Sequence, residues 1–225
     1  MKDRSIFVLF HKPYGCLSQF TAEDGQKTLS DYELPKDIYA VGRLDKDSEG
    51  LLLLTNNGHI QHILSHPKYE HEKAYWVQVE GDIDEQSLET LRKGVQLKNY
   101  QTKACNVQKI QPPEILPRVP PIRDRKNIPT SWIEITLTEG KNRQIRRMTA
   151  HVGYPTLRLI RIRIEGLHLG SLPIGKWRFV QKEEITTKQG LWGHLMSTSN
   201  QIQEKKRNMP NKKTHRNPSS KSKKQ

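Results

Sequence analysis

A short polar loop at residues 42–50 carries the carboxylate on which the rest of the sequence would have to converge. It contains Asp45 next to Arg43 and other charged side chains, and it runs directly into four consecutive leucines at 51–54. Polar loops anchored on a buried strand are common places for active sites. An ionised carboxylate beside a cation can act as a nucleophile or a base. The loop alone is equally compatible with an ordinary solvated charge.

A second segment offers cations for that carboxylate. Residues 139–148 combine a glycine turn with an arginine-rich helix start, which contains Arg143, Arg146 and Arg147. Arg143 and Arg147 are four residues apart and share a helix face, so we expect them to bind phosphates or face solvent. Arg146 lies between positions expected to be buried and is the better candidate for an inward, paired arginine.

Other classes of site lack support in the sequence. Four histidines lie between residues 59 and 71, but their spacing is not a standard zinc pattern and Pro67 interrupts the helix that would carry them. The two cysteines form neither a disulfide framework nor a C-x-x-C site. No G-x-G-x-x-G, P-loop or G-x-S-x-G motif occurs. A zinc site, a nucleotide cofactor and a serine-hydrolase site therefore lack support.

The charge of the chain favours a polyanionic partner. The net charge is +14 over 225 residues, and residues 201–225 hold nine Lys or Arg against one Glu. The other 200 residues are also basic, with 29 Lys or Arg against 23 Asp or Glu. A basic excess in both parts indicates RNA or DNA, because cations neutralise phosphates. Solubility alone is the alternative explanation.

No segment predicts a membrane span or an export signal. The uncharged run at the N-terminus is only six residues long. No apolar run approaches the roughly 20 residues that cross a bilayer. We expect a cytoplasmic protein without a membrane partner.

The elements that must position these residues are mostly short strands. Leu51–Leu54 reads as a buried strand, and residues 74–80 alternate so that Tyr75 lies on the inward face. Further strands are expected at 6–10, 95–97, 104–110, 132–137, 160–164 and 175–180, with a bulge near 157–159. The strands outnumber the helices without regular βαβ alternation, so the predicted class is α+β with a mixed, mainly antiparallel sheet.

Three helices are predicted from their capping residues. Asn56 or Asn57 can cap a helix that ends before Pro67, and Asp84 can cap a second that ends at Gly94. The third runs over residues 143–152. Between the second and third helices, residues 111–130 contain six prolines and form an irregular connection.

The sequence predicts two parts. Residues 1–185 form a catalytic domain, and residues 186–225 form a basic C-terminal tail. Residues 197–225 contain almost nothing apolar to bury, so we expect them to be disordered.

Four segments together resemble the bacterial pseudouridine synthases. The branch is that of the ribosomal small-subunit synthase A and the large-subunit synthases B, E and F, and residues 127–132 and 148–161 look most like the E type. The matching segments, in the family's order, are residues 12–15, 42–52, 73–75 and 139–148. The resemblance covers roughly residues 5–182, and the chain has no room for the S4-type RNA-binding domain with which many members begin.

The resemblance implies a fold, a reaction and a set of roles. The fold is a mixed, mainly antiparallel central sheet split by a catalytic cleft. The reaction isomerises one uridine to pseudouridine, in ribosomal RNA and for the E type in large-subunit RNA, without metal or organic cofactor. Asp45 would be the nucleophile or base, Tyr75 would stack on the uracil, and Arg146 would pair with Asp45.

The remaining positions that match the family are expected to contact RNA. Arg43 would enter the RNA stack where the flipped base has left. Further RNA contacts are expected from Lys12, Lys73, Arg143 and Arg147.

Two other functions compete with isomerisation. One is a catalytically idle RNA-binding protein. The other is an N-glycosidase that releases a base, with Asp47 or Glu49 as its acid. In each case we expect a monomer.

Overall fold

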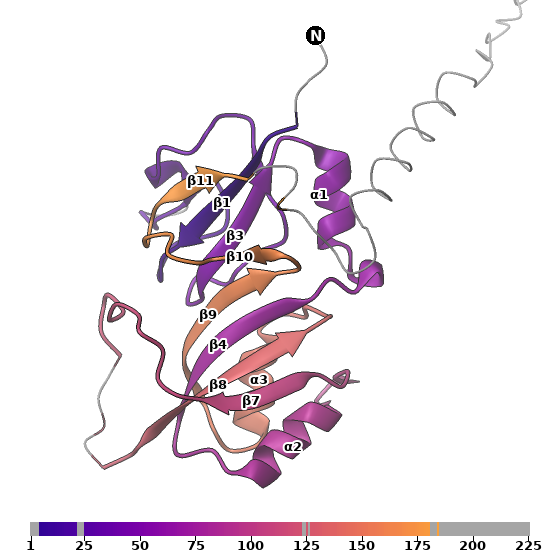
Figure 1. Ribbon diagram of the computed structural model, residues 1–225, viewed down its shortest axis with the longest axis vertical. Helices are drawn as coiled ribbons and strands as arrows, with labels where there is room; N and C mark the ends of the chain where they lie inside the picture. The colour runs from indigo at the N-terminus through magenta and orange to yellow at the C-terminus, as the bar shows by residue number, and fades with distance from the viewer. Residues whose placement is uncertain (1–4, 22–24, 123–124, 126, 181–183, 185–225) are drawn as a thin grey trace, which may run out of the picture.

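A mixed sheet organises the part of the chain that the computed structural model describes, namely residues 5–21, 25–122, 125, 127–180 and 184. The predicted tail at 186–225 lies outside the described residues. The strand order is β11-β1-β3-β9-β4-β8-β7, with β10 paired to β9 and β2 paired to β3 (Figure 1). Its strands are β1 (Phe7–Lys12), β2 (Tyr39–Ala40), β3 (Glu49–Thr55), β4 (Lys73–Glu80), β7 (Asn106–Ile110), β8 (Thr130–Leu137), β9 (Thr156–Ile164), β10 (Leu167–His168) and β11 (Trp177–Phe179).

The remaining elements are helices and one small hairpin. The hairpin pairs β5 with β6 and lies apart from the main sheet. These elements are β5 (Gln96–Leu97), β6 (Tyr100–Gln101), α1 (Gly58–Ser65), α2 (Glu85–Lys93), α3 (Gln144–His151) and the 3-10 turns η1 (Leu29–Asp31) and η2 (Pro67–Tyr69). The predicted α+β class is confirmed, since among the described strand pairs only β3 and β9 run parallel.

The first two helices begin where their capping residues predicted. The Asn57 side chain accepts hydrogen bonds from the backbone N–H groups of His59 and Ile60, and Asp84 accepts from Ser87. α3 begins differently, because its N-cap Arg143 has a left-handed backbone (φ 50°) and makes no side-chain cap. An arginine in this conformation is held by its surroundings rather than by local preference.

A very short parallel contact joins two halves of the sheet. β3 pairs with β9 only at Glu49 opposite Ile160 and Gly50 opposite Arg161. Gly50 has φ +101°, and a Cβ there would lie 2.3 Å from the carbonyl oxygen of Arg161. Only glycine permits so close an approach of the two backbones. In Figure 1, β11, β1 and β3 lie above this contact and β4, β8 and β7 lie below it.

A buried ion pair reinforces the same contact. The Arg158 guanidinium donates from Nε and Nη2 to the two carboxylate oxygens of Glu49, at 2.8 Å each. The two side chains are 6% and 2% exposed. Since losing either partner would leave an uncompensated buried charge, Glu49 and Arg158 hold β3 and β9 together as a unit.

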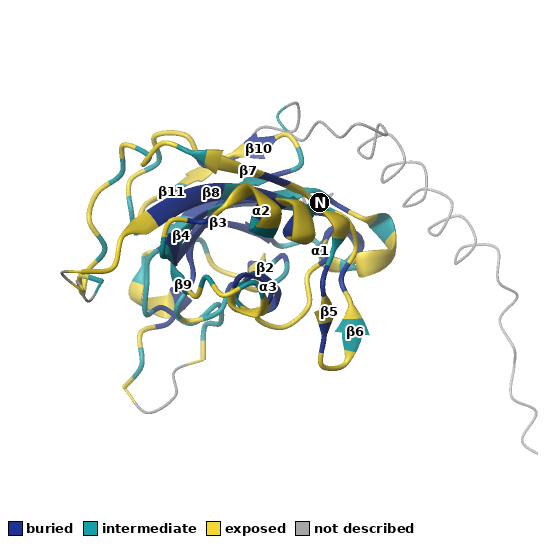
Figure 2. Ribbon diagram, turned by 90° about the horizontal axis from the view of Figure 1, so that it is seen from below, coloured by how far each residue is buried: buried dark blue, intermediate teal, exposed yellow. Residues whose placement is uncertain are grey.

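The sheet is covered on both sides. On one face, α1 packs against Leu51 and Leu53 in a core that continues onto β9 and β10. On the other face, the segment before β3 covers Leu52 and Leu54, whereas α2 and α3 cover β4 and β8. Figure 2 shows α3 below the buried strands of the sheet.

One row of residues crosses the sheet where the two halves meet. The row consists of Lys12 on β1, Gly50 on β3, Arg161 on β9 and Tyr75 on β4, each directly opposite the next. Directly opposed residues of neighbouring strands place their side chains on the same face. On that face, the row therefore lies between the segment before β3, which covers one half of the sheet, and helices α2 and α3, which cover the other half.

β9 departs from the simple alternation expected from its sequence. Its pairing with β4 shifts register twice. The first shift lies between Ala74 and Tyr75 of β4, and the second lies between Gln78 and Val79. The first shift leaves Ile162 unpaired, so Arg161 faces Tyr75, and Arg161 is buried while Ile162 is only half-buried. The second shift lies at Leu157, in the region where a bulge was predicted.

The outer edge of β1 is covered by β11. Val8 and Phe10 lie opposite Phe179 and Trp177, and the Val180 N–H donates to the Phe7 carbonyl at 2.8 Å. Four residues of β1, from Phe7 to Phe10, are buried.

Among the described residues, no helix is both long and apolar enough to cross a membrane.

Candidate active site

A cleft of about 500 Å³ opens where the two halves of the sheet meet. One wall is the polar loop with Arg43 and Asp45, and the opposite wall is the turn before α3 with Lys141 and Arg143. The floor comes from β4 and β9, and the far end from residues 64–67 after α1. Residues from all four segments of the family motif lie in this cleft or directly support it.

The backbone on either side of Asp45 is fixed by the segment that follows β1. The Ser18 hydroxyl accepts from the Leu44 N–H at 3.1 Å and donates to the Leu44 carbonyl at 2.8 Å. The Gly15 N–H donates to the Lys46 carbonyl at 2.8 Å. The Asp45 side chain is 34% exposed and lines the cleft. The loop thus presents a reachable carboxylate on a bound backbone.

Lys12 supports this arrangement from below, which corrects its predicted role as an RNA contact. The side chain is fully buried, and its ammonium donates to the carbonyls of Cys16 and Pro13 at 2.6 and 3.0 Å. Burial lowers the pKa of Lys12 to about 8. A buried ammonium that is bonded to the 13–16 turn cannot reach RNA. Lys12 instead holds the turn whose Gly15 N–H binds the polar loop.

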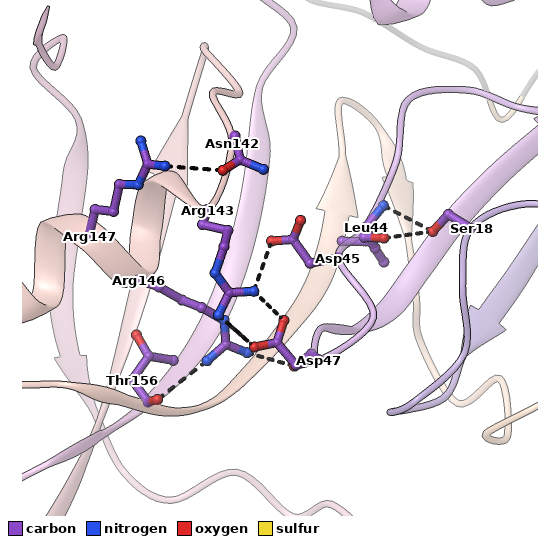
Figure 3. A network of polar contacts seen from close by, with 9 residues as sticks. All are labelled: Ser18, Leu44, Asp45, Asp47, Asn142, Arg143, Arg146, Arg147 and Thr156. Atoms are coloured by element: carbon purple, nitrogen blue, oxygen red, sulfur yellow. Dashed lines mark hydrogen bonds and ion pairs between the residues drawn. The ribbon is translucent and has the colours of Figure 1, made fainter. Parts of the chain in front are cut away.

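The arginines of α3 bind Asp47 (Figure 3), which corrects the expected pairing of Arg146 with Asp45. Arg146 Nη2 donates to the Asp47 carbonyl at 2.6 Å, and its Nε lies 3.3 Å from the Asp47 carboxylate. Arg143 donates to both carboxylate oxygens of Asp47 at 2.8 Å. Arg143 also lies 3.9 Å from the Asp45 carboxylate. Arg143 is therefore the cation that forms an ion pair with Asp45, although it was expected only to contact RNA.

Burial and charge shift the pKa values in this cluster. Burial alone would raise the pKa of Asp47, but the hydrogen bonds from Arg143 and the charges of both arginines bring it below its usual value. The pKa of Arg143 is raised, mainly by its hydrogen bonds to Asp47. Burial lowers the pKa of Arg146, and Asp47 opposes that shift. The cluster is a stable ion network that attaches α3 to the loop.

Tyr75 occupies the floor of the cleft on the face that its strand phase predicted. It is 8% exposed and lies directly opposite Arg161 across the β4–β9 pair. It lines the cleft together with Leu44 and Leu159, next to which it also packs in the core. A ring held in this way offers one face to a planar ligand that enters the cleft.

The other predicted RNA contacts fall into distinct positions. Arg43 is exposed at the mouth of the cleft, and no hydrogen bond or ion pair holds its side chain within the described part of the chain. Arg147 is exposed outside the cleft and donates to Asn142 at 3.1 Å. Lys73 lines the cleft and donates to the His71 carbonyl at 2.9 Å. Burial, followed by the charge of Arg161, lowers the pKa of Lys73 to about 8.

Sequence reasoning missed Arg161 and the pair formed by His71 and Glu165. Arg161 is 3% exposed, lines the cleft and donates from Nε to the Leu51 carbonyl at 2.8 Å. His71 Nδ1 lies 3.1 Å from Glu165, and its Nε2 has no partner among the described residues. Their positions depend on the short β3–β9 contact and on the bulge in β9, which leave no signal in a single sequence.

The histidines after β3 form a ring series. His62, His66, Tyr69 and His71 follow one another with centroid distances of 5.2, 6.2 and 6.0 Å. Within the described residues, no group of three or more His, Cys, Asp or Glu side chains has the arrangement of a metal site.

Comparison with known proteins agrees with this geometry. A family model described as RNA pseudouridylate synthase matches residues 6–151. The ribosomal large subunit pseudouridine synthase E of Vibrio parahaemolyticus is 55% identical over 181 residues, which are 80% of this chain and 76% of the relative. The protein of the same name from Xanthomonas campestris is 50% identical over 176 residues, or 77% and 94% of the two chains.

More distant relatives extend the match. The ribosomal large subunit pseudouridine synthase B of Bacillus subtilis is 33% identical over 195 residues, which are 86% of this chain and 75% of the relative. A crystal structure of a pseudouridylate synthase superposes with a TM-score of 0.66 at 26% identity, over 81% of this chain and 73% of the other. The branch expected from the four motifs is confirmed. Because the family model matches residues 6–151 and relatives that are 50–55% identical cover more than three quarters of its length, this chain belongs to the RNA pseudouridylate synthase family.

Proposed function

We propose that this protein converts a specific uridine of large-subunit ribosomal RNA to pseudouridine and that Asp45 is its nucleophile or base. The observation that carries the proposal is the Asp45 carboxylate, which is 34% exposed in the cleft while the backbone on both sides of it is hydrogen-bonded. The names of the E-type relatives, which are 50–55% identical, support the choice of large-subunit RNA.

The site contains the groups that such a reaction needs. The N1–C1′ bond breaks, the base turns, C5 bonds to C1′, the proton leaves C5 and N1 gains one. The Asp45 carboxylate can attack C1′ or C6, or remove a proton from the sugar in a glycal route. Tyr75 offers a ring face to the uracil. These assignments make Asp45 and Tyr75 the residues that touch the reacting nucleotide.

The rim of the cleft is suited to a polyanion. Arg43 and Arg143 are exposed there, and Lys141 lies over the Tyr100 ring at 4.4 Å from its centroid. We assign these cations to the RNA backbone. Arg43 also supplies a planar cation that can stack where the flipped base has left, and such stacking offsets part of the few kcal/mol that flipping costs.

The competing N-glycosidase reaction would need a free acid beside Asp45. Glu49 is buried in its ion pair with Arg158, and Asp47 accepts two hydrogen bonds from Arg143. Neither carboxyl is available to protonate a leaving base. This arrangement favours isomerisation over base release.

The first test replaces the proposed nucleophile. In Asp45→Asn we expect the rate of tritium release from RNA labelled at uracil C5 to fall about 1,000-fold or more, because the amide is neither nucleophile nor base. RNA affinity and melting temperature should stay close to those of the wild type. Asp37→Asn is the matched control, since Asp37 is exposed outside the cleft and asparagine tolerates its positive φ of 59°. Wild-type tritium release by Asp45→Asn would refute the assignment.

Product analysis separates the candidate functions. Nuclease digestion and liquid chromatography should show a nucleoside of unchanged mass with a shifted retention time. A glycosidase would leave an abasic site, and a binding protein would leave uridine. Mapping pseudouridines in total RNA with and without the protein identifies the target. A monomeric state and a cytoplasmic location stay predictions.

A further inference from the structure

The strongest unexplained feature of the cleft is a buried arginine without a counter-charge. Arg161 is 3% exposed, and its Nη2 has no hydrogen-bond partner among the described residues. In the same part of the chain, no carboxylate lies within ion-pair distance of its guanidinium. Burying an unpaired cation costs several kcal/mol. Arg161, which is destabilising in this respect, lines the cleft.

A second cation lies close by on the same floor. Lys73 is two residues from Tyr75 on β4, and its charge and that of Arg161 disfavour one another. The carboxylate whose charge acts on Lys73 is Glu165, which already accepts from the Glu72 N–H at 2.9 Å and lies against His71. The floor of the cleft is therefore electropositive before any ligand enters.

The depth of these cations indicates which part of an RNA they meet. A flipped nucleotide enters with its base first, while its phosphates stay with the strand at the surface. Arg43 and Arg143 are exposed at the rim, where phosphates would lie, whereas Arg161 is at the floor opposite Tyr75. The group that reaches Arg161 is thus the base, whose electron-rich atoms are its carbonyl oxygens.

We propose that Arg161 and Lys73 bind the carbonyl oxygens of the flipped uracil and stabilise the negative charge that the base carries once its N1–C1′ bond has broken. The inference rests on the proposed function and identifies the residues that would bind the uracil as it leaves C1′. The electron pair of the broken bond passes to N1 and is shared with O2 and O4, while C1′ bonds to Asp45 or loses a neighbouring proton to it. C5 then bonds to C1′ as the C1′–O bond to Asp45 breaks or, in the glycal route, as C2′ regains its proton from Asp45. The C5 proton leaves, and N1 is protonated. Fixed cations facing a developing oxyanion act in this way in many enzymes.

The test compares two leaving groups in single turnovers. RNA carrying uridine or 5-fluorouridine at the target is the substrate, and loss of the N-linked nucleoside after nuclease digestion is measured. Fluorine at C5 withdraws electrons and makes the base a better leaving anion. With uridine, we expect Lys73→Met and Arg161→Gln to cleave about 100-fold more slowly than wild type. With 5-fluorouridine the loss should be about tenfold, so that the ratio of the two rates rises about tenfold.

Three further measurements make the result decisive. Lys73→Arg keeps the charge and should recover much of the rate, and Lys176→Met, an exposed lysine outside the cleft, should behave as wild type. The melting temperature should not fall in Lys73→Met, because the change removes a half-buried charge that is partly desolvated. The inference would be overturned if the variants lost the same factor in cleavage rate on both substrates, or cleaved both at the wild-type rate. Either result would leave the proposed function standing, because the wild-type protein would still convert uridine. Failure of the wild-type protein to convert uridine would instead overturn the proposed function, and this inference with it.

Discussion

The two aspartates of the polar loop at residues 42–50 have different partners. Asp47 receives two hydrogen bonds from Arg143 and the ion pair of Arg146, whereas the Asp45 carboxylate, within the described residues, has only Arg143 at 3.9 Å as a charged partner. Because Asp47 takes the strong bonds, the Asp45 carboxylate keeps lone pairs free for a substrate. The arginines still act on Asp45 through their charge.

Replacing Asp47 should therefore affect stability with a defined pH dependence. Its pKa lies below 3.8 in the folded protein, so its contribution is present above that pH and is lost as the pH falls through the folded pKa. We expect Asp47→Asn to lower the free energy of unfolding by about 1–2 kcal/mol at pH 7 and by clearly less at pH 3. Urea unfolding at both pH values measures this.

An exposed pair provides the control. Asp82 binds Lys109, and both side chains are largely exposed, so Asp82→Asn should change the unfolding free energy by less than about 1 kcal/mol. A loss in Asp47→Asn that is the same at pH 3 and pH 7 would contradict the ion network as its cause.

The sequence located most of these residues but not their pairing. Helical spacing predicted that Arg146 points inward, and its side chain is 13% exposed. Which aspartate it meets depends on the turn in which the Ser48 N–H donates to the Asp45 carbonyl. Such a turn is set by tertiary contacts. Lys12 was misassigned for a similar reason, since its burial follows from a strand pairing that no local pattern records.

Among the elements, the two-residue contact between β3 and β9 has the strictest steric requirement. Gly50 is the residue at which the backbones meet, with a positive φ and a Cβ position only 2.3 Å from the Arg161 carbonyl. Any side chain there separates the strands that also carry Arg161 and the buried pair of Glu49 and Arg158. Both the stability of the fold and the position of Arg161 in the cleft thus depend on Gly50.

Gly50→Ala tests this requirement. We expect it to lower the free energy of unfolding by about 3 kcal/mol or more, or to prevent folding, because of overpacking and the unfavourable φ. Gly58→Ala at the start of α1 is the matched control, as nothing lies within 4 Å of its Cβ position, and it should be neutral or slightly stabilising. Thermal unfolding measures both, and a wild-type melting temperature for Gly50→Ala would show that the strands can separate without cost.

Elements with local signals were predictable, and the others were not. Asn57 and Asp84 mark helix starts because capping is a local interaction. β6 was not predicted, because two residues of a hairpin carry too little pattern. The burial of Arg161 could not be predicted either, since it depends on the pairing of β9 with β3 and β4 and on the bulge at Ile162.

For the whole molecule, the distribution of charge governs how it meets RNA. The basic excess is divided between residues 1–200 and residues 201–225, of which the latter hold nine Lys or Arg against one Glu. Each phosphate contact steepens the salt dependence of binding. Removing residues 197–225 should therefore weaken RNA binding and flatten the plot of log affinity against log salt, with an unchanged melting temperature. Filter binding at several salt concentrations measures both, and an unchanged slope would exclude the tail from binding.

The pairing of β1 with β11 limits how far such a truncation can go. A chain that ends before Trp177 would leave the outer edge of β1 without its hydrogen-bonded neighbour. That edge belongs to a strand whose residues from Phe7 to Phe10 are all buried. An apolar strand with free N–H and C=O groups is a template for a second molecule. By pairing with β1, β11 thus prevents self-association through that edge. Shortened forms that lack β11 should aggregate, in addition to binding RNA less tightly.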